Sequence, residues 1–165
     1  MNDLAGFEEI WCVDTEYSAP TGHRPKPICL VARELRSGQQ LRLWEDQLAQ
    51  LQAAPFRTDD RSLVVAYAAA AEFSVFHVLG WPAPQRTLDL FFEFRALTNG
   101  LYTPSGCGLL GALVYHGLPA MEGAEKDEMR QLAIRGGPFT DSERQALLDY
   151  CDEDVIALTR LLPAM

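Results

Sequence analysis

The sequence has few basic residues for its number of acidic ones. Among 165 residues, 14 are Lys or Arg and 23 are Asp or Glu, which gives a formal net charge of −9. A protein that holds nucleic acid through an extended electrostatic surface has the opposite balance. The charge therefore excludes a dedicated nucleic-acid clamp, but it is compatible with an enzyme that meets phosphate groups through metal ions.

Other absences narrow the class of protein further. No apolar run approaches the ~20 residues of a membrane-spanning helix, and residues 1–9 lack the basic start and apolar centre of a signal peptide. The histidines are scattered and no two cysteines have CxxC spacing, so neither a histidine-based site nor a zinc site is expected. We expect a cytoplasmic protein without a membrane partner, with reduced and mostly buried thiols at Cys12, Cys29, Cys107 and Cys151.

Length and composition are typical of one globular domain, which we expect to cover residues 1–165. Apolar runs rich in β-branched residues predict strands at 10–13, 28–32, 41–44, 63–67 and 87–89. Helical spacing predicts helices at 47–54, 68–79, 90–98, 107–116, 126–134 and from about 140, where Thr140 and Glu143 form a capping box. This order predicts an α/β fold, a mixed sheet of about five strands flanked by helices.

Acidic residues gather where the predicted strands end, which is where such folds bind ligands. Asp14 and Glu16 follow the first strand and, two residues apart, share one face of the chain. Two carboxylates without a basic neighbour repel each other, and a divalent cation between them removes the repulsion. A solvated acidic loop is the alternative.

The last helix carries a second acidic group, around Tyr150 and Asp154, which lie one turn apart on one face. Asp152 and Glu153 are expected on a solvated face opposite the apolar stripe of the helix. Asp154 does not fit that explanation well, because it stands beside Tyr150 and Val155.

These motifs, in this order, resemble the DEDD exonucleases, the DnaQ-like 3′→5′ exonucleases of the ribonuclease H-like superfold. Tyr150, four residues before Asp154, corresponds to the DEDDy type, and Asp149 stands where the histidine type has its histidine. The stretch from Trp81 to Asp154 resembles the N-terminal proofreading domains of phage-type family A DNA polymerases. The resemblance implies hydrolysis of phosphodiester bonds at single-stranded DNA 3′ ends, with a polymerase domain in the same or another chain as partner.

Two other functions stay open at this stage. One is an RNA exonuclease of the ribonuclease D kind, which sequence separates poorly from the DNA enzyme. The other is a catalytically silent exonuclease fold that acts as an interaction module.

The second motif of the family reads Asn, three residues, Asp, whereas this chain has Ala68 and Glu72 at those positions. Asp89, after the next strand, is the alternative fourth carboxylate or an outer partner.

The resemblance also implies roles for individual residues around two Mg²⁺ or Mn²⁺ ions. Asp14 bridges both ions, Glu16 and Asp154 complete the first, and Glu72 supports the second through water. Tyr150 orients the attacking water, because a tyrosine with a pKa near ~10 is a poor base. Residues considered for substrate contact are Tyr17, which follows Glu16 and could stack on the terminal base, together with Lys126, Asp89, Arg130, Arg24 and Lys26.

Overall fold

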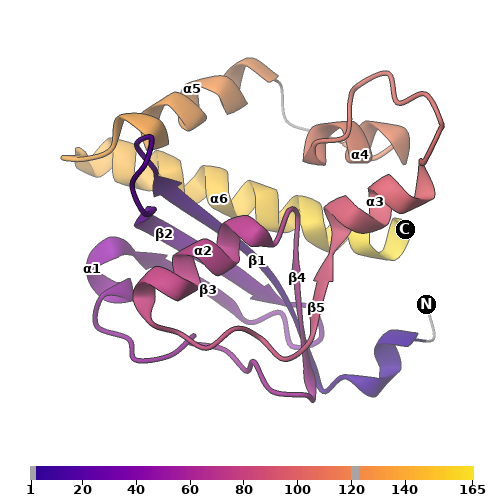
Figure 1. Cartoon of the computed structure of the whole chain (residues 1–165), viewed down its shortest axis with the longest axis horizontal. Coiled ribbons are helices and arrows are strands. Elements are labelled where there is room, and N and C mark those ends of the chain that lie inside the picture. The colour runs from indigo at the N-terminus through magenta and orange to yellow at the C-terminus, as the bar shows by residue number, and fades with distance from the viewer. Residues whose placement is uncertain (1–2, 120–122) are drawn as a thin grey trace.

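A computed structural model describes residues 3–119 and 123–165. The sheet has five strands in the order β3-β2-β1-β4-β5, in which β2 is antiparallel to its neighbours β1 and β3, whereas β1, β4 and β5 are parallel (Figure 1). The strands are β1 (Glu9–Ser18), β2 (Lys26–Glu34), β3 (Gln40–Trp44), β4 (Ser62–Ala66) and β5 (Thr87–Asp89). This sheet, with helices on it, confirms the α/β class expected from the sequence.

Helices cover both faces of the sheet. They are α1 (Glu45–Leu48), α2 (Ala70–Leu79), α3 (Leu90–Leu97), α4 (Leu109–Tyr115), α5 (Gly123–Arg135) and α6 (Asp141–Leu161), with short 3₁₀ turns η1 (Asp3–Gly6) and η2 (Leu162–Ala164). Thr140 and Glu143 form the expected capping box at the start of α6. None of the helices within the described residues combines the length and the apolar composition of a membrane-spanning segment.

Alternation along β1 divides the core between the two faces of the sheet. Cys12 packs with residues of α6 such as Val155 in one buried cluster. Trp11 and Val13 pack in a second cluster with Phe76 of α2. The sheet is therefore held between α6 on one side and α2 on the other (Figure 1).

Two elements differ from the expectation based on sequence. β1 does not end at Val13 but continues to Ser18, because β2 pairs with it that far and supplies backbone hydrogen bonds that the apolar pattern does not reveal. α1 covers residues 45–48 instead of 47–54. It begins directly after Trp44 because the Gln47 side chain accepts a hydrogen bond from the Trp44 backbone N–H at 3.0 Å.

Ion pairs fix α6 on the sheet in addition to its apolar contacts. Arg33 of β2 lies 3.2 Å from Asp152 (Nη2 to Oδ1), and Gln40 of β3 donates a hydrogen bond to Asp152 Oδ2 at 2.7 Å. The solvated position expected for Asp152 is therefore wrong, whereas Glu153 is exposed. Each such pair adds little stability by itself, but the pairs together fix the rotation of α6 about its axis.

Candidate active site

The candidate site begins where β1 extends past its parallel neighbour. β1 pairs with β4 only as far as Cys12, whereas it pairs with β2 as far as Ser18. Asp14 and Glu16 therefore lie within β1 but beyond the carboxyl end of its pairing with β4, and both are partly buried. A β-bulge between Glu16 and Tyr17 then changes the register of the strand. The sequence placed the two acids correctly relative to the sheet but ended the strand too early.

α6 contacts β1 at the level of Asp14. The Cys151 thiol lies 3.2 Å from Asp14 Oδ2 and 3.3 Å from the Asp14 carbonyl oxygen, and it donates to this residue. Tyr150 precedes this cysteine, and Asp154 follows it by about one turn of the helix. Sequence reasoning treated Cys151 only as an apolar position, and its place next to Tyr150 was the one signal that could have found this contact.

α2 contributes a carboxylate from its first turn. Glu72 is 2% exposed, and among the described residues its Oε2 has no hydrogen-bond partner. Burial raises the pKa of the Glu72 carboxyl well above its ordinary value, and the nearby negative charge of Asp14 raises this pKa further. Asp89 and Glu16 add smaller effects of the same sign. The buried oxygen of Glu72 thus lies in a site dominated by negative charge.

The carboxylates of the site also raise the pKa values of its two tyrosines, Tyr17 and Tyr150. Burial raises the pKa of Tyr150 above its usual range, with further increases from Asp154, then Glu16 and Asp14, so the phenol stays neutral. Burial likewise raises the pKa of Tyr17. Among its charged neighbours, Glu72 raises this pKa the most.

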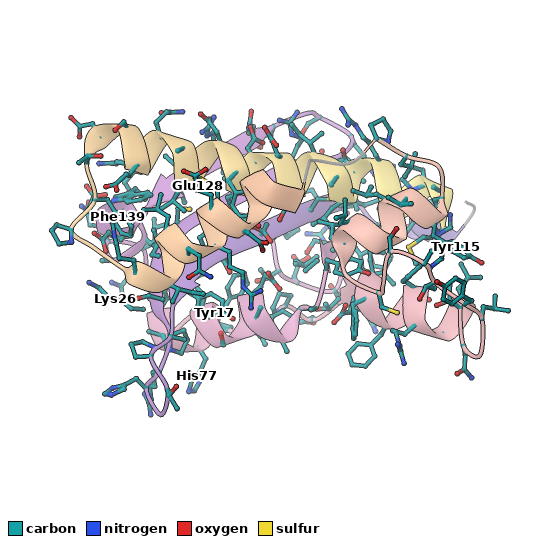
Figure 2. All side chains as sticks on the ribbon, turned by 90° about the horizontal axis from the view of Figure 1, so that it is seen from above. Tyr17, Lys26, His77, Tyr115, Glu128 and Phe139 are labelled. Carbon is teal, nitrogen blue, oxygen red and sulfur yellow. The ribbon has the colours of Figure 1, made fainter. Side chains whose placement is uncertain are left out.

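Residues on β1, α2 and α6 therefore lie within electrostatic reach of one another. Seen from above, Tyr17 lies between the ribbons of α5 and α2 (Figure 2).

Asp89 has a different environment from Glu72. Its Oδ1 accepts hydrogen bonds from the backbone N–H groups of Ala68 (3.0 Å) and Phe91 (2.9 Å), and its Oδ2 accepts one from Ala69 (2.9 Å). Its oxygens are thus engaged by the protein backbone, whereas Glu72 retains an unpaired oxygen. Of the two carboxylates considered from sequence, Glu72 is the one whose environment suits an additional ligand.

The remaining residues considered for substrate contact are less informative. The side chain of Lys126 lies outside the described residues, while Arg130 of α5 and both Arg24 and Lys26 are exposed. Lys26, labelled in Figure 2, is the first residue of β2 and pairs with Ser18, the last residue of β1.

The donor set of the site suits a hard divalent cation. Within residues 3–119 and 123–165, no three His, Cys, Asp or Glu side chains form a ready metal-binding cluster. The unpaired and buried Oε2 of Glu72, close to the charge of Asp14, is nevertheless the kind of oxygen that a cation would stabilise. An all-oxygen set of carboxylates is the usual environment of Mg²⁺ or Mn²⁺. The residues present therefore fit such an ion chemically.

No family model and no curated protein matches the sequence. Among solved structures, the chain is similar to the apo form of a nuclease, with a TM-score of 0.63 and 15% identity over 99% of this chain and 74% of that one. It is also similar to the EXO domain of Aedes aegypti Nibbler, with a TM-score of 0.56 and 13% identity over 98% of this chain and 82% of that one. At these identities the likeness shows the fold, which these nucleases share with this chain and which is consistent with the ribonuclease H-like fold expected from sequence.

Proposed function

We propose that this chain is a divalent-metal-dependent 3′→5′ exonuclease of the DEDDy type that removes nucleotides from single-stranded DNA 3′ ends. The observation that carries the proposal is the buried Glu72 carboxylate. Its Oε2 has no hydrogen-bond partner among the described residues, and the nearby charge of Asp14 raises its pKa. A buried carboxylate with one oxygen left uncompensated is costly, so its presence beside other acids points to a ligand of positive charge. The shared fold with two nucleases supports the same interpretation.

Four carboxylates would hold the cations: Asp14 and Glu16 from β1, Glu72 from α2 and Asp154 from α6. When bound, divalent cations supply the positive charge that a phosphodiester needs in so acidic a site, and they polarise the phosphate oxygens. Cys151 donates to the Asp14 carboxylate and restrains its orientation.

Tyr150 can position water at this site. Its pKa is raised by burial and by the surrounding carboxylates, so the hydroxyl is neutral at physiological pH and both donates and accepts hydrogen bonds. A neutral phenol one helical turn from Asp154 is suited to orienting a water molecule against the phosphate, and unsuited to removing its proton. Tyr17 offers an aromatic ring next to Glu16 on which a terminal base can stack.

Proofreading beside a polymerase domain, in this chain or another, completes the proposal. An acidic domain with few basic residues holds a 3′ end weakly by itself. A polymerase that already binds the duplex would deliver that end to the site at high local concentration.

The proposed activity is tested with DNA and RNA oligonucleotides of one sequence, labelled at the 5′ end. We expect a ladder of products shortened one nucleotide at a time from the 3′ end of DNA, in Mg²⁺ or Mn²⁺ and not with chelator. Asp14→Ala should abolish the ladder, whereas Asp60→Ala, an exposed acid before β4, should not.

Three outcomes would contradict parts of the proposal. A chelator-resistant ladder would overturn the dependence on metal. Shortening of RNA alone would replace the DNA substrate by RNA. No cleavage of either strand under any condition would indicate a catalytically silent fold that serves as an interaction module.

A further inference from the structure

Among the described residues, one carboxylate near the site, Asp89, accepts hydrogen bonds from backbone N–H groups, and two of these groups lie where α2 begins. Asp89 stands at the end of β5 and caps α3 through Phe91. The same carboxylate reaches across to the turn between β4 and α2, where it accepts hydrogen bonds from the N–H groups of Ala68 and Ala69. Three segments are thereby joined through a single side chain.

The turn that Asp89 holds has a strained backbone. Ala68 has φ of +65°, the left-handed conformation that is strained for any residue other than Gly. Among the described residues other than glycine, Ala68 alone has a positive φ. Such a conformation persists only where neighbouring contacts impose it, and the two hydrogen bonds from Ala68 and Ala69 to Asp89 are such contacts.

This turn also sets where α2 starts. The carbonyl oxygen of Ala68 accepts a hydrogen bond from Ala71 N–H at 2.9 Å, and that of Ala69 accepts one from Phe73 N–H at 3.0 Å. Ala69 is the N-cap residue of α2 and has no side chain to cap the helix. Asp89 therefore fixes, from another strand, the two residues that immediately precede the first helical residue of α2.

Glu72 lies in the first turn of this helix. Its carboxylate is buried and Oε2 has no hydrogen-bond partner among the described residues, so no hydrogen bond from them fixes this oxygen. The position of this oxygen relative to Asp14 then follows from where α2 begins and in which direction it leaves the sheet.

We propose that Asp89 is a positioning residue of the site, which holds the left-handed Ala68 turn and thereby places Glu72 to share a divalent cation with Asp14. The inference rests on the proposed function for its nuclease readout, although cation binding and backbone protection test it independently. Its rival is a purely structural role, in which Asp89 stabilises the fold and nothing else.

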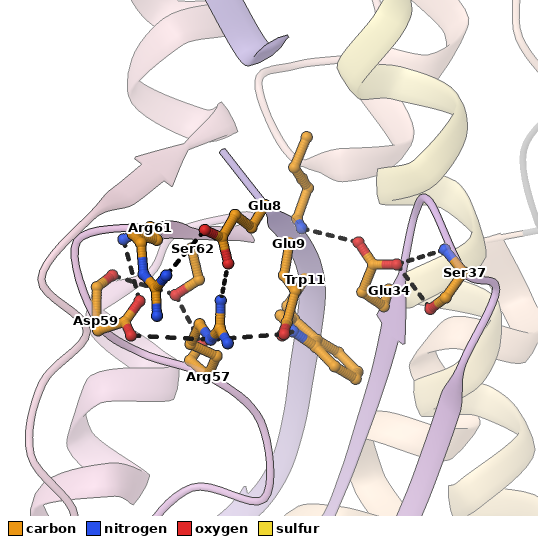
Figure 3. A network of polar contacts seen from close by, with 10 residues as sticks. Glu8, Glu9, Trp11, Glu34, Ser37, Arg57, Asp59, Arg61 and Ser62 are labelled. Carbon is orange, nitrogen blue, oxygen red and sulfur yellow. Dashed lines mark hydrogen bonds and ion pairs between the residues drawn. The ribbon is translucent and has the colours of Figure 1, made fainter. Parts of the chain in front are cut away.

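The chain contains a matched control for that rival. Glu34 is also buried, and its carboxylate accepts hydrogen bonds from the backbone N–H groups of Ile10, Arg36 and Ser37. Figure 3 shows its contacts with Ser37. These contacts lie near the amino-terminal end of β1, away from Asp14. Glu34→Gln should therefore reproduce the loss of stability without altering the site.

Asp89→Asn is the informative variant because it keeps the shape of the side chain. Asn can keep one oxygen on Ala68 and Phe91, which preserves the cap of α3, while its amide then faces the Ala69 N–H and repels it. Ala68→Gly in the same background removes the cost of the left-handed turn and should restore part of what is lost. If the single variant Asp89→Asn does not fold, the double variant Asp89→Asn/Ala68→Gly is compared with Glu34→Gln instead.

The experiment compares the wild type with these variants in three measurements. They are the Mg²⁺ concentration that gives half-maximal nucleotide release, the rise in Tm caused by Mn²⁺, and amide hydrogen exchange at Ala69. We expect Asp89→Asn to raise the Mg²⁺ requirement about tenfold, to reduce the Mn²⁺-induced rise in Tm and to speed exchange at Ala69. Ala68→Gly should reverse these changes in part, and Glu34→Gln should lower Tm alone.

The outcomes separate this inference from the proposed function. A wild type that responds to Mn²⁺ but releases no nucleotide overturns the function, while the Tm and exchange data still test the role of Asp89. Equal effects of Asp89→Asn and Glu34→Gln on the metal measurements, or no effect of either, would overturn the positioning role.

Discussion

Replacing Glu72 by Gln should make the metal-free protein more stable, and increasingly so as the pH rises. Glu72 is 2% exposed, and its Oε2 has no hydrogen-bond partner among the described residues. Burial, and after it the charge of Asp14, raises the pKa of this carboxyl above its ordinary value of 4.5. Gln is nearly the same size and never ionises, so the variant removes the charge with little change in packing.

The sign of the effect follows from proton linkage. Below pH 4.5, Glu72 is protonated in both the folded and the unfolded chain and contributes nothing. Above that pH, the folded chain keeps a proton that the unfolded chain has lost, so the free energy of unfolding decreases as pH rises. The slope for one proton is at most about 1.4 kcal/mol per pH unit, and it ends at the folded pKa. The Glu72→Gln variant lacks this slope, so the gap in stability between variant and wild type widens.

The assay is urea unfolding in chelator from about pH 5 to about pH 8. Glu93→Gln, which neutralises an exposed glutamate on α3, controls for the loss of one acid from a chain of net charge −9. Only Glu72→Gln should show a stability difference from wild type that grows with pH. A difference that stays constant over this range would refute the argument that Glu72 ionises at a cost in the folded state.

Four further predictions concern other residues and conditions. Asp14→Ala should abolish nucleotide release and leave metal-free stability equal or higher, because it removes a repelling charge; a marked fall in Tm would show that Asp14 is mainly structural. Tyr150→Phe should lower the maximal rate about 10–100-fold with an unchanged Mg²⁺ requirement, since only a hydroxyl that orients water is lost, and a collapse of Mg²⁺ affinity would contradict this role. Nucleotide release from single-stranded DNA should fall only gently with salt, because few basic residues are present to release counterions, so a steep slope would reveal an unsuspected basic surface. Cys107 should react first with iodoacetamide, since Thr103 and then Arg95 lower the pKa of its thiol while burial raises that of Cys12 to about 12; peptide mass spectrometry showing equal labelling of Cys12 would contradict it.

Much of the fold followed from local pattern. The apolar runs located all five strands, and the capping box located the start of α6, because hydrophobic periodicity and cap chemistry are local properties of the chain. Asp14 and Glu16 were placed on one face of a strand by alternation alone, and Tyr150 and Asp154 on one turn of a helix by its pitch. That these two pairs meet follows only once α6 packs on β1.

What only the tertiary structure decided was which polar groups find partners. Sequence favoured Glu72 as the fourth carboxylate and kept Asp89 as the alternative. In the structure, three backbone N–H groups, two of them about 20 residues away in the chain, engage Asp89, whereas Glu72 Oε2 has no hydrogen-bond partner among the described residues. The thiol of Cys151 donates to Asp14 across 137 residues, a contact whose only trace in the sequence is the place of this cysteine next to Tyr150. A carboxylate's free energy in a fold depends on the donors and charges that other segments bring to it, and a one-dimensional pattern does not carry that information.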